Sequence, residues 1–201
     1  MQFYSDDRQD EFVANLLEFK RNGYYVDIGS GASVGSNNTY FFESLGWKGI
    51  CIDINPVFNE SYRSRTCKYF NEDALNINYE KIFREELFPP TIDYLSLDVD
   101  EASTKVLEKL PLSTYGFKVI TIEHDSHVHG GLYKDVQREI LDAQKYHLLC
   151  ADVLNISGRN IGQEHAWEDW WVMPNWIEGQ KLKKLQSYKL DAAQIISKFT
   201  K

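Results

Sequence analysis

The sequence of 201 residues predicts a three-layer α/β sandwich built around a mostly parallel sheet of seven strands. Short runs of apolar, strand-forming residues alternate along the chain with segments of helical periodicity. This alternation is the pattern of parallel strands that are joined by helical crossovers. The expected sixth and seventh strands, 147–153 and 166–173, follow each other without a helical pattern between them. We therefore expect the last strand to run antiparallel to its neighbours.

The remaining elements are predicted from apolar periodicity and from capping residues. Strands are expected at 24–28, 49–53, 67–70, 92–98 and 118–123. Helices are expected at 6–21, 38–45, 79–87, 102–110 and 133–146, with another starting near Pro56 and a basic, amphipathic one from 179 to 198. No linker or repeat divides the chain, so we expect a single domain over 1–201. It would comprise an N-terminal helix within 1–22, a core over 24–175 and a C-terminal helix over 179–199.

Charge and composition restrict the partners. A net charge of −8 argues against broad contact with a nucleic-acid backbone. No apolar run approaches the roughly 18 residues that a membrane span requires, and the N-terminus lacks a signal-peptide pattern. Cys51, Cys67 and Cys150 lie in predicted strands without metal-type spacing, so we expect buried, reduced thiols in a cytoplasmic protein. Association into a homo-oligomer is left open.

A glycine-rich loop follows the first predicted strand. The segment 24–35 has glycines at 29, 31 and 35, and glycine lets a backbone turn sharply and approach a ligand closely. The next strand ends at Asp53, where a carboxylate can accept hydrogen bonds from both hydroxyls of a ribose. Val34 stands where a dinucleotide-binding fingerprint has its third glycine. This departure favours a nucleoside cofactor other than a nicotinamide dinucleotide.

Acidic residues also follow other predicted strands. Asp27 precedes the loop and is placed to anchor loop amides or an ammonium group of a cofactor. Asp73 is placed to meet an adenine amino group, with the Ala74 amide on a ring nitrogen. Asp98 would face the amino-acid end of a cofactor or the acceptor. Any one of these acids is equally well explained as a helix N-cap, but together they are expected in one crevice.

A run of three histidines and two acids, residues 123–129, follows the fifth strand. A polar surface loop is the simplest interpretation. The run also offers a general base, for which His124 ranks first, since it lies nearest the strand end, with Asp98 and Glu123 as the other catalytic candidates. Asp98, Asp100 and Asp125 are candidate ligands for a divalent metal. Carboxylates favour Mg²⁺, whereas the histidines would admit Zn²⁺ or Mn²⁺.

Tryptophans cluster in the last predicted strand, beside Glu168 and Asp169. Alternation along a strand places Trp170 and Trp171 on opposite faces of the sheet. We expect one of these two indoles in the core, and the other is a candidate wall of an acceptor pocket.

Several segments, in chain order, resemble the FkbM-type family of S-adenosylmethionine-dependent methyltransferases. They extend over roughly 24–175, and the most specific are 45–56 and 92–100. The resemblance implies a class I methyltransferase fold, which is Rossmann-like, and methylation of a hydroxyl on a sugar or natural product. It places Asp27 and the loop residues Gly29, Ser30 and Gly31 around the cofactor, Asp53 on its ribose and Asp73 on its adenine. Family members commonly have Asp-x-Glu-Gly after strand four, where this chain has Asp-Val-Asp-Glu at 98–101.

We therefore expect an S-adenosylmethionine-dependent O-methyltransferase that acts on a sugar, a glycan or a small metabolite. Neither a nucleic-acid partner nor a membrane span is expected. One alternative is an NAD(P)-dependent oxidoreductase, because Asp53 suits any adenosine ribose. The other is a non-catalytic module that binds a nucleoside or a partner protein.

Overall fold

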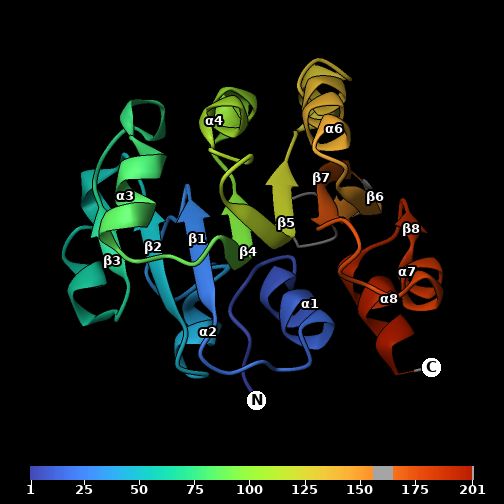
Figure 1. The fold of residues 1–201 in the computed structure, drawn as a ribbon, viewed down its shortest axis with the longest axis horizontal. Coiled ribbons are helices and arrows are strands. Elements are labelled where there is room, and N and C mark those ends of the chain that lie inside the picture. The colour runs from blue at the N-terminus through green and yellow to red at the C-terminus, as the bar shows by residue number, and fades with distance from the viewer. Residues whose placement is uncertain (156–164, 201) are drawn as a thin grey trace.

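The computed structural model describes residues 1–155 and 165–200, which form a three-layer α/β sandwich (Figure 1). Its sheet has eight strands in the order β3-β2-β1-β4-β5-β7-β6-β8. β7 pairs antiparallel with β5 and with β6, whereas the other strand pairs are parallel. The strands are β1 (Tyr24–Ile28), β2 (Lys48–Ile52), β3 (Lys68–Phe70), β4 (Thr91–Leu97), β5 (Gly116–Glu123), β6 (His147–Asn155), β7 (His165–Val172) and β8 (Ser187–Tyr188). The predicted architecture and the reversed seventh strand are confirmed, and the strand number rises from seven to eight.

Helices cover both faces of the sheet (Figure 1). One face carries α3 (Tyr79–Glu85), α4 (Ser103–Lys109) and α6 (Lys134–Ala143), and the other carries α1 (Gln9–Leu16), α2 (Tyr40–Glu43), α7 (Gly179–Leu185) and α8 (Ala192–Ile196). Each face has its own apolar core. Trp170 belongs to one core and Trp171 to the other, and both are at most 1% exposed. Strand alternation therefore places these indoles as predicted, but both serve the core.

The C-terminal segment differs from the single helix that its apolar pattern predicts. After α7, residues 187–188 form β8 and pair with Cys150 and Ala151 of β6. Asp191 then starts α8 with a capping box, in which its carboxylate accepts from the Gln194 N–H at 2.9 Å. A capping box marks a helix start, and the extended pair before it supplies the unexpected eighth strand.

The N-terminal segment also departs from its prediction, because α1 begins at Gln9. The carboxylate of Asp10 accepts hydrogen bonds from the Tyr4 and Ser5 N–H groups at 2.6 and 3.3 Å, which folds residues 4–8 back against the helix. The rings of Phe3 and Phe41 lie 4.6 Å apart between centroids, so the segment also packs on α2. The chain before α1 is thereby held at the carboxyl edge of the sheet.

Smaller differences concern single turns. The segment after Pro56 forms two 3₁₀ turns, Pro56–Phe58 and Ser61–Ser64, and no α-helix. The histidine-rich run contains one helical turn, α5 (Ser126–His129). All three cysteines are free; two are buried, but Cys67 precedes β3 and is partly exposed. No described helix is long and apolar enough to cross a bilayer.

Arg65 fixes the loop that connects β1 to α2. Its buried guanidinium donates to the Glu43 carboxylate at 2.5 Å, to the Ser33 carbonyl at 2.6 Å and to Asn37 Oδ1 at 3.2 Å. Asn37 in turn donates to the Ser30 carbonyl at 2.9 Å. One buried guanidinium therefore supplies hydrogen-bond donors to the Ser33 carbonyl and the Asn37 amide oxygen of this loop.

We expect the substitution Arg65→Met to lower the free energy of unfolding by about 3–5 kcal/mol, because it leaves the Glu43 carboxylate without its buried partner. Urea denaturation followed by tryptophan fluorescence measures the change. Arg63→Met is the matched control, since its ion pair with Glu60 is 77% and 78% exposed and should contribute at most about 1 kcal/mol. Equal effects of the two substitutions would contradict the role of the Arg65 network.

Candidate functional site

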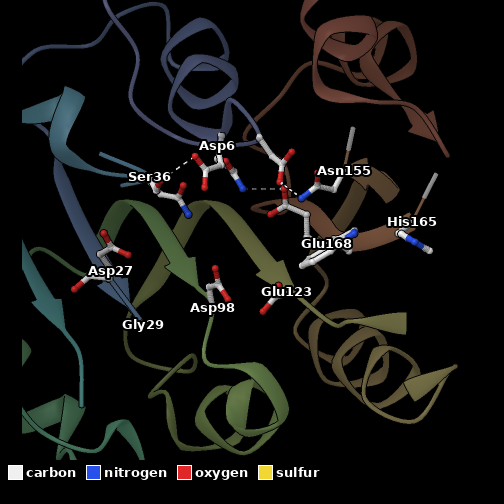
Figure 2. Close-up of a pocket in the computed structure, with 14 residues that line it drawn as sticks. Asp6, Asp27, Gly29, Ser36, Asp98, Glu123, Asn155, His165 and Glu168 are labelled. Carbon is white, nitrogen blue, oxygen red and sulfur yellow. Dashed lines mark hydrogen bonds between the residues drawn. The ribbon is translucent and has the colours of Figure 1, made fainter. Parts of the chain in front are cut away.

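Two pockets meet at the carboxyl ends of the strands and share Gly29 and Asp98 in their walls. The first, here called the acidic pocket, has a volume of about 250 Å³ (Figure 2). Its wall contains six carboxyl side chains, those of Asp6, Asp7, Asp27, Asp98, Glu123 and Glu168. The second, called the β2 pocket, has a volume of about 370 Å³ and lies beyond the ends of β2 and β3. Ligand pockets in α/β sheets form at this edge.

Gly29 is the close-contact point between β1 and β4. It has φ +79°, and a Cβ at this position would lie 1.6 Å from the Asp98 carbonyl oxygen. The Asp98 N–H donates to the Ile28 carbonyl at 2.9 Å, which holds the two strand ends together. Because only glycine fits this approach, the prediction that the loop needs a glycine here has a physical basis in the structure.

Asp53 joins the end of β2 to the glycine loop. Its Oδ2 accepts from the Gly31 N–H at 2.8 Å, and its Oδ1 accepts from the Asn55 N–H at 2.7 Å. Asp53 also lines the β2 pocket. A carboxylate oxygen has a second acceptor site, so each oxygen can still accept a hydroxyl of a ligand while the loop remains bound.

Asp73 and Ala74 line the other side of the β2 pocket. The Asp73 carboxylate accepts from the Leu75 N–H at 2.9 Å and so caps a 3₁₀ turn that begins at Ala74. The wall of the pocket also contains the apolar side chains of Ile54, Phe58 and Val99 and three further acids, Glu72, Asp98 and Asp100. Ile54 is 68% exposed, so a ligand in the pocket can contact its side chain.

Asp27 and Ser30 lie in the wall of the acidic pocket near the loop. Asp27 accepts a hydrogen bond from the Thr39 hydroxyl at 2.7 Å, and burial raises the pKa of its carboxyl to about 6. The Ser30 hydroxyl is buried without a hydrogen-bond partner in the described chain. The end of β1 and the loop therefore offer this pocket an acid with a raised pKa and a hydroxyl that has no partner among the described residues. Gly31 contributes its N–H to Asp53 and lines neither pocket.

Asp98 and Glu123 form a close pair of acids in the centre of the acidic pocket (Figure 2). Burial, and then the neighbouring Asp98 carboxyl, raise the pKa of Glu123 far above its ordinary value. Burial also raises the pKa of Asp98. Two carboxyls this close share one proton readily, since ionising both is costly.

His124 lies outside both pockets. Its ring is buried, Nδ1 accepts from the Ser126 N–H at 3.2 Å, and Nε2 lies 3.6 Å from Asp169 Oδ1. Arg138 donates to the same Asp169 carboxylate at 2.7 and 2.9 Å. The structure thus places the first-ranked base candidate in a buried network between β5, β7 and α6, apart from Asp98 and Glu123.

The three predicted metal ligands are only partly brought together. Asp100 and Asp125 group with Glu123, and one oxygen of each lies within 4.8 Å of the others. Asp98 is not part of this group, but its carboxyl contacts that of Glu123. These oxygen donors fit Mg²⁺ better than a softer metal. A second group, His124 with Asp152 and Asp169, is already neutralised by Lys134 and Arg138. The metal therefore stays a prediction, with Glu123 as an added ligand candidate.

Part of the acidic pocket comes from residues that no sequence motif indicated. Asp6, Asp7 and Gln9 come from the segment at α1, and Asn155 and Glu168 come from β6 and β7. The only sequence signal for the first group was the adjacent acid pair before a helix, which also suits a helix start. Their shared position depends on the long-range packing of the N-terminal segment.

The tryptophan in the wall of the acidic pocket is Trp167. The two predicted candidates, Trp170 and Trp171, do not line this pocket. Trp170 and Trp171 are both in the core, so the prediction that one of them forms the acceptor wall is wrong. Trp167 stacks on His127 with 4.4 Å between ring centroids. The histidine-rich run thus supports the pocket wall from behind.

The fold is that of class I methyltransferases, which solved structures share at low sequence identity. Dnmt2 methyltransferase of S. pombe superposes with a TM-score of 0.57 at 15% identity, over 79% of this chain and 52% of that protein, so the chain spans about half its length. A TehB-like SAM-dependent methyltransferase from Corynebacterium glutamicum gives 0.52 at 11% identity, over 86% and 89% of the two chains. A candidate O-methyltransferase from Klebsiella pneumoniae gives 0.53 at 11% identity, over 83% and 80%.

Other matched structures include proteins described as RNA methyltransferases, so the fold is compatible with several kinds of acceptor. No family model and no curated protein matches the sequence. The FkbM-type family is therefore not confirmed, whereas the methyltransferase fold that it implied is.

We expect millimolar Mg²⁺ to raise the melting temperature if the group of Asp100, Glu123 and Asp125 binds it, because a ligand that binds only the folded state stabilises that state. Differential scanning fluorimetry with MgCl₂, and with EDTA added, measures the shift. Asp125→Asn should reduce it, and Glu108→Gln on the exposed side of α4 is the control. An unchanged melting temperature would remove the metal from the description of this site.

Proposed function

We propose that the protein is an S-adenosylmethionine-dependent methyltransferase that methylates a hydroxyl of a sugar, a glycan or a small metabolite. The observation that carries this proposal is the charge of the two joined pockets. No Lys or Arg is present among the described residues that line either pocket, although carboxylates are abundant. A nucleoside that carries positive charge and no phosphate suits such walls.

The β2 pocket would hold the nucleoside. Asp53 would accept the ribose hydroxyls, and Asp73 with the Ala74 amide would meet the edge of the adenine. The side chains of Ile54 and Val99 would contact the faces of the ring, which explains the exposed isoleucine. Gly29, at the junction, leaves room for the backbone of the loop to approach the cofactor.

The acidic pocket would hold the amino-acid end of the cofactor and the acceptor. Asp27 and Asp98 would face the ammonium group, next to the hydroxyl of Ser30. When bound, the cofactor would supply an electrophilic methyl group on a sulfonium, so the protein mainly has to align the acceptor oxygen with it. The Asp98–Glu123 pair, which shares one proton, would take the hydroxyl proton through its ionised carboxylate as the oxygen accepts the methyl group.

The Asp98–Glu123 pair is a better base candidate than His124, because both acids line the pocket and His124 does not. His124 would act as a positioning residue that holds the end of β5 against β7. This arrangement assigns catalysis to the Asp98–Glu123 pair and leaves the histidine in a structural network.

An NAD(P)-dependent oxidoreductase is the less favoured alternative. A dinucleotide has a pyrophosphate, which is usually met by backbone N–H groups at a helix N-terminus or by cations. Here the helix after the loop, α2, begins only at Tyr40, and the walls near Gly29 are acidic. A non-catalytic nucleoside-binding module would share the β2 pocket but would not need the Asp98–Glu123 pair.

Isothermal titration calorimetry with S-adenosylmethionine and with NAD tests the cofactor. We expect binding of S-adenosylmethionine only, and Asp53→Ala should weaken it roughly ten- to a hundredfold, because charge-assisted hydrogen bonds are lost. Glu60→Ala, an exposed acid outside both pockets, is the control and should leave the dissociation constant unchanged. Binding of NAD without S-adenosylmethionine would sink the proposal.

The assignment of the base predicts different results for two substitutions. Glu123→Gln removes one member of the proton-sharing pair and should reduce the rate of methyl transfer by about 10²–10⁴-fold with cofactor binding retained, which is the usual contribution of general acid–base catalysis. His124→Gln should lower the melting temperature, because it disrupts the buried network with Asp169. The rate of methyl transfer per folded molecule should stay close to that of the unchanged protein. Labelled methyl transfer to a hydroxylated acceptor and circular dichroism measure the two effects. A larger loss of rate with His124→Gln would restore the histidine as the base.

A further inference from the structure

The acidic pocket has a side that the cofactor leaves vacant in the proposed arrangement. Asp7, Gln9 and Glu168 line the acidic pocket but not the β2 pocket. Gln9 and Asp7 are hydrogen-bonded to Glu168 of β7 and Asn155 of β6, respectively. Figure 2 shows Glu168 next to Glu123 and opposite Asp27. We call these three residues the acceptor subsite. Whatever binds here must be recognised by their chemistry.

The acceptor subsite offers hydrogen-bond acceptors almost exclusively. Gln9 Nε2 donates to Glu168 Oε1 at 3.1 Å, and this bond turns the amide so that Gln9 Oε1 remains available. That oxygen is buried, and no donor reaches it from the described residues. Gln9 and Glu168 are only 8% and 7% exposed, so the wall is built into the fold. A buried acceptor without a partner is costly unless a ligand supplies the donor.

Among the described residues, no Lys or Arg in the wall of the acidic pocket compensates the charge of the acceptor subsite. Asp7 accepts from Asn155 Nδ2 at 2.8 Å, a neutral donor. Arg8, which follows Asp7 in the sequence, pairs with Glu11 instead. Burial and neighbouring acids raise the pKa of Asp7 to about 6, and burial and Asp7 raise the pKa of Glu168. A cation in this place would relieve the repulsion.

We propose that Asp7, Gln9 and Glu168 bind a protonated primary amine that is carried by the methyl acceptor. An ammonium group has three donors and no acceptor, which complements two carboxylates and one amide oxygen. Glu168 is the direct register partner of Glu123 across β7 and β5, so the amine and the reacting hydroxyl lie close together on the acceptor. The inference rests on the proposed methyl transfer and narrows the acceptor to hydroxylated amines, such as amino sugars and amino alcohols.

This assignment also separates the acceptor from nucleic acids. A phosphodiester would have to approach six carboxyl side chains in a wall that has no Lys or Arg among its described residues. Such an approach is unfavourable because like charges at short range repel. Transfer of methyl groups to an RNA oligonucleotide would therefore overturn the proposal.

The test compares charged acceptors with their neutral counterparts. Glucosamine, galactosamine and 2-aminoethanol are each paired with the N-acetyl form, which lacks the charge, and binding is measured by calorimetry with and without S-adenosylhomocysteine. We expect at least one amine to bind about tenfold or more tightly than its N-acetyl form. Equal binding within every pair, or no binding of any amine, would overturn the proposal.

Two variants assign the preference to the acceptor subsite. Glu168→Gln and Asp7→Asn should each lose most of the preference for the amine while the affinity for S-adenosylmethionine stays within about twofold. Glu108→Gln, which changes the net charge equally at an exposed position on α4, should keep the preference. Circular dichroism excludes unfolding. If both variants keep the preference, the amine does not bind these residues and the proposal fails.

Separate binding measurements with amines and with S-adenosylmethionine distinguish a failure of the acceptor subsite from a failure of the proposed function. A protein that binds amines but not S-adenosylmethionine would retain the acceptor subsite and disprove the methyltransferase. Binding of S-adenosylmethionine without a preference for amines would disprove the acceptor subsite and leave the proposed methyltransferase intact. Mass spectrometry of the product then locates the methyl group: a methyl ether supports the anchoring role, and methylation of the amine nitrogen overturns it.

Discussion

The contact between the ends of β1 and β4 is the constraint on which the geometry of both pockets depends. Gly29 packs so closely against the Asp98 carbonyl that a single added carbon would collide with it at 1.6 Å. Because both residues belong to the walls of both pockets, this contact sets the distance between the acidic pocket and the β2 pocket. Arg65 holds the outer part of the same loop from behind, through Ser33 and Asn37. The junction between the two pockets is therefore held from both sides.

The fold also brings acids that repel one another together in the acidic pocket at the carboxyl ends of the strands. Asp7, Asp27, Asp98, Glu123 and Glu168 all have raised pKa values, and burial is the largest cause for each. The fold tolerates this arrangement although it would be more stable with neutral residues there. Such a cost at a pocket is typical of a binding site, where a ligand of opposite charge compensates the acids. The buried ion pairs elsewhere, such as Arg138 with Asp169, show that the chain neutralises acids where no ligand is expected.

The fold class and the position of Gly29, Asp53 and Asp73 at the carboxyl ends of the strands could be predicted, because their signals are local. Apolar runs mark strands, and Asp53 and Gly29 follow directly from strand ends. The wall formed by Asp7, Gln9 and Glu168 could not be predicted, because these residues meet only through packing of distant segments. The orientation of His124 could not be predicted for the same reason: it follows a strand, but its ring turns toward Asp169 and away from the acidic pocket. The single predicted C-terminal helix failed because periodicity over two short helices conceals the strand between them.

The position of β7 has a consequence for the order in which the molecule can assemble. Residues 24–100, which supply most of the β2 pocket and one wall of the acidic pocket, form neighbouring parallel strands with short sequence separation. Glu168 reaches Gln9 only across a separation of 159 residues, after β7 has entered between β5 and β6. Contacts of such long range form late, because closing a long loop costs entropy before the contact repays it. A chain that emerges from its N-terminus can therefore complete the β2 pocket well before β7 adds the opposite wall of the acidic pocket.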